Sequence, residues 1–238
     1  MVDLILANLF VGLAAFIQAA VGIGFAMIAV PLLALIDLAY VPASALLVML
    51  VLSTYMLVSG WRDIDRDGLS TLLPGLLVGT LIAAALLPLL DGQWFGVVFG
   101  FIVLFGVALS FLGNLPPPTR AQFGAGGLLA GLMGTMSGIH GPPLVLLYQQ
   151  ASPAQARATI ALIFTIGTLL SLASLYGQGY ATPDDLTRAL PLLPGLLAGL
   201  ALAVWSRNLM SRKLARTLML SLAALSALSL IYKSLVGG

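Results

Sequence analysis

The chain contains no cysteine and few charged residues, and each absence excludes a class of protein. Without cysteine there can be neither a disulfide framework nor a thiolate metal site. Charged residues make up 8% and hydrophobic residues 61% of the 238 residues, whereas a water-soluble domain has about 25% charged residues. The mean hydropathy of +1.12 agrees with this bias. The composition therefore predicts an integral membrane protein.

Histidine and membrane-buried acids are equally scarce. His140 is the single histidine, and all eight acidic residues lie outside the predicted spans or at their edges. A membrane-embedded enzyme needs a nucleophile with a base, or a cluster of metal ligands. We therefore expect no enzyme activity, no metal site and no cofactor. The same distribution leaves no carboxylate in mid-membrane to carry a coupling proton, and only His140 remains as a titratable candidate there.

Two long apolar stretches without charge carry the strongest functional signal. Residues 4–36 and 121–156 are each too long for one ordinary crossing, since roughly 20 residues span the hydrocarbon core. Glycines interrupt the first as Gly22-Ile23-Gly24 and the second as Ser137-Gly138-Ile139-His140-Gly141-Pro142-Pro143. Paired interruptions in corresponding halves point to a transporter's binding site. We therefore expect a protein that moves a small solute across a membrane.

Six further apolar runs have spanning or near-spanning length. They cover residues 38–60, 69–90, 94–113, 159–176, 189–206 and 217–232. If each long stretch returns to the side from which it came, eight of the ten basic residues collect on one side: Arg62, Arg66, Arg120, Arg157, Arg207, Arg212, Lys213 and Arg216. Basic loops stay in the cytoplasm. Both termini are therefore predicted outside the cytoplasm, and it stays open whether the long stretches are re-entrant hairpins or pairs of short crossings.

An internal repeat divides the chain. Residues 73–79 recur as residues 193–199 with one difference, Val78 against Ala198, and a glycine break precedes each copy at a comparable distance. The predicted topology runs the two copies in opposite directions. We therefore predict an all-α polytopic membrane protein with two inverted repeats, residues 1–113 and 123–238, joined by a linker at residues 114–122. Each repeat would be a broken or re-entrant helical hairpin followed by three transmembrane helices.

The interruptions favour an anion as the solute. A helix that begins at a break presents unpaired N–H groups and the positive end of its dipole. The candidate substrate contacts are Gln18, Gly22, Gly24, Ser137, Gly138, His140, Gly141 and Arg157. Each has an alternative explanation that the residues alone leave open. The glycines could serve helix packing, the polar side chains could bond helix to helix, and Arg157 could be a cytoplasmic anchor.

On several of these residues the chain resembles the TauE/SafE family of membrane permeases. The resemblance rests on the Gly-x-Gly break followed by Pro31-Leu32-Leu33, on the loop at residues 137–143, and on Arg157-Ala158-Thr159 at the start of the next helix. It covers nearly the whole chain. The resemblance implies export of sulfite and related organosulfur anions, with Arg157 as an anion contact.

Together these features predict a multi-pass transporter of the plasma (inner) membrane that carries a small anion outward. Sulfite or a related organosulfonate is the expected substrate, and passive export assisted by the membrane potential is the expected mechanism. The expected surroundings are the lipid bilayer and, as a possible homodimer, a second copy, with no nucleic acid. The alternative is an ion-coupled uptake permease for a small carboxylate or sulfonate, which would use the same broken helices.

Overall fold

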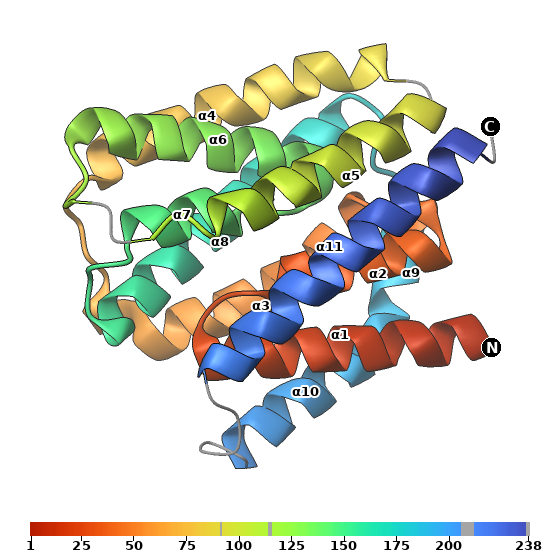
Figure 1. Ribbon diagram of the computed structural model, residues 1–238, viewed down its shortest axis with the longest axis horizontal. Coiled ribbons are helices and arrows are strands. Elements are labelled where there is room, and N and C mark those ends of the chain that lie inside the picture. Colours follow the sequence, from red (N-terminus) through yellow and green to blue (C-terminus); the bar gives the residue numbers. More distant parts are fainter. Residues whose placement is uncertain (91, 114–115, 206–211, 237–238) are drawn as a thin grey trace.

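The computed structural model describes residues 1–90, 92–113, 116–205 and 212–236, and every regular element in them is helical. Figure 1 shows the longer helices running roughly along one direction, with both ends of the chain at the same end of the molecule. The elements are α1 Val2–Val21, α2 Phe25–Ile36, η1 Leu38–Tyr40, α3 Ala43–Gly60, η2 Trp61–Asp63, α4 Leu69–Leu86, η3 Leu87–Leu89, α5 Gly92–Leu109, α6 Arg120–Ser137, α7 Gly141–Leu147, α8 Pro153–Gly177, α9 Pro183–Ala189, η4 Leu190–Leu192, α10 Leu193–Trp205 and α11 Arg212–Val236.

Six segments of the described residues are long and apolar enough to cross a membrane. They are Val2–Ala19, Ala43–Asp63, Leu69–Leu89, Pro153–Gly177, Pro183–Trp205 and Arg216–Val236. An all-helical membrane protein is therefore confirmed. Two details differ from the prediction. The run at residues 94–113 forms a shorter apolar helix, Trp94–Leu109, whereas α1, the first arm of a predicted hairpin, is itself of spanning length.

The two long charge-free stretches form helical hairpins with unequal arms. In the first, α1 has 20 residues and α2 has 12, which correspond to about 30 Å and 18 Å of helix. In the second, α6 has 18 residues and α7 has seven. Each hairpin therefore consists of a long helix followed by a short one, and not of two half-helices of similar length.

The short return helices are enclosed by protein. Nine residues of α2 are buried, and α2 packs against α1, α11 and α3. Four of the seven residues of α7 are buried, and α6, α5 and α8 surround it. Because interrupted backbone at membrane depth must be covered by protein or line a water-filled cavity, this enclosure is what the two breaks require.

Close glycine contacts join elements that lie far apart in the sequence. The tightest pair is α4 with α6, where a Cβ on Gly79 would lie 2.0 Å from the Leu128 carbonyl oxygen. The pair of α1 with α10 is built in the same way, since a Cβ on Gly199 would lie 2.1 Å from the Gly12 oxygen. Small residues let membrane helices approach this closely. Thus one helix of each predicted repeat, α4 or α10, packs on the first helix of the other repeat.

Some predicted features fall partly or wholly outside the described residues. Residues 114–115 of the predicted linker are among these, as is Arg207 of the predicted basic side. The structure begins α6 at Arg120, inside the predicted linker, because Thr119 and Gln122 form a capping box there. Helix α6 thus begins before the end of the predicted linker, while the boundaries of the two repeats stay a prediction.

Candidate functional site

The first break ends α1 at the left-handed Gly22, and α2 starts three residues later, at Phe25. Gly22 has φ +96° and Gly24 has φ +121°, a region that favours glycine. The side chain of Gln18 then reaches across the break, and its Oε1 accepts a hydrogen bond of 2.8 Å from the Phe25 amide. Gln18 therefore caps α2, while the next two amides, those of Ala26 and Met27, have no carbonyl of their own helix to reach.

The second break has the same helix end but fewer amide donors. Gly138 has φ +78°, and its amide bonds to the Gly134 oxygen at 2.7 Å. In the first break the Gly22 amide bonds the Gln18 oxygen at 2.6 Å in the same manner. Pro142 and Pro143 follow Gly141 in the first turn of α7, and proline has no N–H group. The first turn of α2 therefore offers more amide donors than the first turn of α7.

A small cavity lies where the two breaks meet, and we call it the central cavity. Its volume is about 20 Å³, which is the room that a single water molecule needs. It is lined by Gln18, Ile23, Gly24, Ala26, Met27, Ser110, Ile139, Gly141, Pro142, Val145, Phe164 and Met219. Three of the predicted site residues, Gln18, Gly24 and Gly141, thus come together here from α1, the first break and α7.

A larger cavity, the vestibule, lies beside the connection between α7 and α8. Its volume is about 170 Å³. It is lined by Gly22, Ile23, Val145, Tyr148, Gln149, Ala151, Pro153, Ala156, Arg157 and Ile160. Pro153 and Arg157 are exposed, so the vestibule lies at the surface of the protein. In Figure 1 this connection lies at the end of the molecule opposite the two termini.

Arg157 of α8 lies directly against the first break. A Cβ on Gly22 would be 3.4 Å from the Arg157 Cγ and 3.6 Å from its Nε. The two residues belong to different predicted repeats, so the sequence separation hides their proximity. A guanidinium offers five donors in a planar fork that suits oxyanions. The structure thus brings together Gly22 and Arg157, two further predicted site residues, in the vestibule.

The central cavity and the vestibule adjoin at two residues. Ile23, at the tip of the first break, and Val145, on α7, contribute to the lining of both. Both are apolar and partly buried.

The remaining predicted site residues lie in neither of these two linings. Ser137 is fully buried, and its hydroxyl donates to the Met133 oxygen of its own helix at 2.7 Å. Gly138 faces Val30, whose Cγ2 would lie 3.4 Å from an added Cβ. The ring of His140 fills a notch against Gly134, where an added Cβ would lie 2.1 Å from Nε2. These contacts favour the packing alternative for all three.

A small polar network surrounds His140. Its Nε2 lies 3.5 Å from the Ser171 hydroxyl, which lies 2.7 Å from the hydroxyl of Thr135. Its ring also packs beside Phe164, with ring centroids 6.2 Å apart. The network connects the second break to α6 and α8, and so fixes where α7 begins.

Sequence reasoning missed two polar side chains of the vestibule, Tyr148 and Gln149. The Tyr148 hydroxyl and the Gln149 Nε2 are buried and have no hydrogen-bond partner in the described residues. Tyr148 lies outside the six candidate spans. Burial and, in second place, the negative charge of Asp65 raise the pKa of the Tyr148 hydroxyl, so it stays a neutral donor. The available signal was a Tyr-Gln-Gln run at residues 148–150 within a stretch that is otherwise almost entirely apolar.

One acidic residue lies within a candidate span, whereas the sequence placed all eight outside the predicted spans or at their edges. Asp185 of α9 is only 6% exposed and lies within the candidate span Pro183–Trp205, near its start. Its carboxylate accepts hydrogen bonds from the Ser44 hydroxyl at 3.0 Å and from the Thr182 amide at 2.8 Å. Arg188 approaches it at 3.8 Å. Asp185 therefore caps α9 and attaches it to α3.

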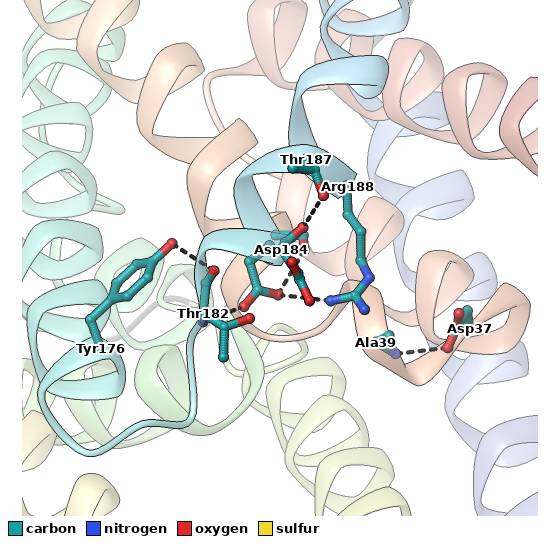
Figure 2. Close-up of polar contacts among 9 residues, drawn as sticks. Asp37, Ala39, Tyr176, Thr182, Asp184, Thr187 and Arg188 are labelled. Atoms are coloured by element: carbon teal, nitrogen blue, oxygen red, sulfur yellow. Dashed lines mark hydrogen bonds and ion pairs between the residues drawn. The ribbon is translucent and has the colours of Figure 1, made fainter.

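Figure 2 shows the surroundings of this cap. The Tyr176 hydroxyl bonds to the Thr182 oxygen at 3.3 Å, and the Thr187 hydroxyl bonds to the Asp184 oxygen at 2.7 Å. In the same view Arg188 extends along α9 toward the acidic side chains. The cluster has its own internal partners, and α9 lies at the end of the molecule that holds the termini. It therefore belongs to the structure of that end and not to the two cavities.

The described residues contain no group of three or more His, Cys, Asp or Glu side chains that could hold a metal ion. The site as built consists of backbone amides, one guanidinium and neutral donors around two cavities. Such groups suit a ligand rich in acceptor oxygens.

Comparison with known proteins shows the family. The family model described as Sulfite exporter TauE/SafE matches residues 7–230. The chain therefore belongs to the TauE/SafE family, a family of membrane transporters and not of enzymes.

Two curated relatives are similar over part of the chain. A probable sulfite/organosulfonate exporter TauE of Cupriavidus necator is 29% identical over 174 residues, which cover 65% of this chain and 65% of that protein. A probable inner membrane transporter protein TsaS of Comamonas testosteroni is 28% identical over 125 residues, which cover 50% of this chain and 52% of that protein. The chain thus matches less than two thirds of the length of either relative. No solved structure matches it.

Proposed function

We propose that this member of the TauE/SafE family exports a small oxyanion, sulfite or a related organosulfonate, across the plasma (inner) membrane. The family and the names of the two relatives support the substrate class. The observation that carries the proposal is the meeting of two helix breaks at one cavity, with Arg157 packed against the nearer break. A compact oxyanion offers several acceptor oxygens to the donors along the path from the vestibule to the central cavity.

The donors along the path come from three sources. Gly24, Ala26 and Met27, at the start of α2, line the central cavity, so the positive end of the α2 helix dipole lies beside it. Gln18 lines the same cavity, with its Nε2 3.7 Å from the Met56 sulfur, which is a weak acceptor. Arg157 adds a full positive charge in the vestibule. None of these groups requires a buried acid, and an anion would find no negative side chain among the residues that line the two cavities.

The central cavity is too small for sulfite as it stands, since it has room for about one water molecule. The vestibule is large enough for a hydrated anion. We therefore assign this conformation to a state in which the path is open to the vestibule and closed at Ile23 and Val145. Transport requires these two side chains to move apart.

The packing of the two halves supports inverted repeats. Residues 73–79 lie on α4, which packs on α6, and their copy at 193–199 lies on α10, which packs on α1. A Cβ on Gly75 would meet the Gly124 oxygen, and a Cβ on the matching Gly195 would meet the Asn8 oxygen. Each half thus supplies the same helix to the other, as a two-fold axis in the membrane plane would demand.

The charge distribution supports an orientation. Arg62, Arg66, Arg120 and Arg157 lie at or beside helix ends on the vestibule end of the molecule, which we propose faces the cytoplasm. Both termini then lie outside. A membrane potential that is negative inside favours the exit of an anion by about 2.3 kcal/mol per charge per 100 mV. We therefore propose passive, potential-assisted export, with no proton carried by an acidic side chain.

The proposal is tested by flux of labelled sulfite into proteoliposomes that contain the purified protein, with ethanesulfonate, sulfate and acetate as competitors. We expect protein-dependent flux that follows an imposed potential without a pH gradient and is slowed more by ethanesulfonate than by acetate. Absence of sulfite flux would refute the substrate. Flux that requires an ion gradient and prefers acetate would support the ion-coupled uptake permease instead.

A further inference from the structure

Two residues that line the vestibule carry buried donors without partners, and Arg157 lines the same cavity. The Tyr148 hydroxyl and the Gln149 Nε2 make no hydrogen bond within the described part of the chain, and both residues line the vestibule with Arg157. An unpaired buried polar group costs free energy, so a folded protein normally satisfies it with a water molecule, an ion or a ligand. Two such donors, on residues that line one cavity together with Arg157, indicate a place for an acceptor.

The surroundings of Tyr148 hold its ring in place. Tyr148 is only 3% exposed, and its ring packs beside Phe123 of α6 with centroids 5.8 Å apart. Phe123 in turn lies against Gly68, where a Cβ would be 2.6 Å from the Phe123 ring. The hydroxyl is therefore carried on a ring that packing fixes, and a fixed donor costs little entropy when it binds.

We propose that Tyr148, Gln149 and Arg157 form a second anion site, in the vestibule, which receives the oxyanion before it passes Ile23 and Val145. This site deepens the proposed function and depends on it. The ligand class is a small oxyanion with three acceptor oxygens, such as sulfite or the head group of a sulfonate. One oxygen would take the Tyr148 O–H, one the Gln149 N–H, and one the guanidinium.

One nearby charge acts against the anion. The carboxylate of Asp65 is close enough to influence the Tyr148 hydroxyl, and it also accepts a hydrogen bond from the Asp67 amide at 2.9 Å. The proposed site therefore binds its anion against this one negative charge. The negative charge of Asp65 gives a second test, because removing that charge should tighten anion binding, whereas removing the donors should weaken it.

The experiment compares Tyr148→Phe with the wild type in oriented proteoliposomes, with sulfite supplied from either side. We expect the KM for sulfite supplied from the vestibule side to rise by about tenfold, the usual effect of losing one hydrogen bond to a charged ligand. The maximal rate from the vestibule side should stay unchanged. Because passive transport without an imposed potential has the same ratio of maximal rate to KM from both sides, that ratio should also fall by about tenfold for sulfite supplied from the other side. Tyr232→Phe, which removes an exposed hydroxyl, is the matched control.

Stability measurements separate this role from a structural one. Tyr148→Phe removes an unpaired buried hydroxyl, so the thermal midpoint without sulfite should stay equal or rise. Asp65→Asn should lower the KM from the vestibule side, and Gln149→Leu should raise it. An unchanged KM in Tyr148→Phe and Gln149→Leu, in a protein that still transports sulfite, would overturn the vestibule site and leave the proposed function standing. Absence of sulfite flux in the wild type would refute the proposed function itself.

Discussion

Replacement of Arg157 by alanine is the substitution whose effect the structure defines best. Arg157 supplies the single positive charge in the lining of the vestibule, and its stem packs on Gly22. A hydrogen bond to a charged partner contributes about 1.5–3 kcal/mol. Because Arg157 is exposed, solvent screening places its contribution at the lower end of that range. Since about 1.4 kcal/mol corresponds to a factor of ten, we expect Arg157→Ala to raise the KM for sulfite by about tenfold.

The assay is labelled sulfite flux at several sulfite concentrations, with thermal stability measured on the same preparations. Arg157→Lys keeps the charge but loses the planar fork, so its KM should lie between those of the wild type and Arg157→Ala. Arg66→Ala is the matched control, because Arg66 is exposed at the same end of the molecule and lines neither cavity.

Two results would refute this reasoning. If Arg157→Ala had the KM of the wild type, the guanidinium would not contact the anion. If Arg66→Ala and Arg157→Ala raised the KM equally, the effect would come from general surface potential and not from the vestibule.

Three further substitutions test the path and the packing. Gln18→Glu keeps an oxygen that can cap Phe25 but adds a negative charge to the central cavity, so sulfite flux should fall at least about tenfold while the fold is retained. Gln18→Leu should lose about 1 kcal/mol of stability, because the cap is missing. Equal sulfite flux in Gln18→Glu and the wild type would contradict the assignment of Gln18 to the path. Val145→Ala should widen the passage between the cavities and raise the maximal rate, and Val145→Phe should lower it; rates insensitive to this side chain would place the passage elsewhere. Gly79→Val should destabilise the protein by about 1–3 kcal/mol or more, because its Cβ would lie 2.0 Å from a backbone oxygen. A Cβ on Gly177 would have no atom within 4 Å, so Gly177→Ala should melt like the wild type in the same thermal scan.

The sequence was sufficient for the class and for the location of the helix ends. Composition and run length alone predict helical spans, and the glycine clusters mark where α1 and α6 end, because only glycine adopts the left-handed conformation of Gly22 and Gly138 at little cost. The unequal arms were not predictable, since no residue in an unbroken apolar run signals how far it extends into the protein. Domain boundaries, the inverted repeat and pairing as a homodimer stay predictions.

The candidate site was harder to read, because its contacts join residues far apart in the chain. Gly22 and Arg157 were both named from the sequence, but nothing local indicates that they touch. His140 drew attention as the single histidine, yet its ring packs into notches at Gly134 and Gly167, which only tertiary structure reveals. Tyr148 and Gln149 are candidates because their donor atoms are buried without hydrogen-bond partners in the described residues. The burial of individual side chains cannot be read from hydropathy.

The central claim is that both helix breaks border one aqueous path, and cysteine labelling tests it most directly because the chain has no cysteine of its own. Single-cysteine variants Ile23→Cys and Val145→Cys would be exposed to a water-soluble maleimide added from the vestibule side, with ethanesulfonate as competitor because sulfite itself attacks maleimides. Leu81→Cys, on an exposed helix face expected to contact lipid, is the control. We predict that both path cysteines react much faster than Leu81→Cys and that ethanesulfonate slows them. Labelling of the cysteines at positions 23 and 145 no faster than at position 81 would contradict the account.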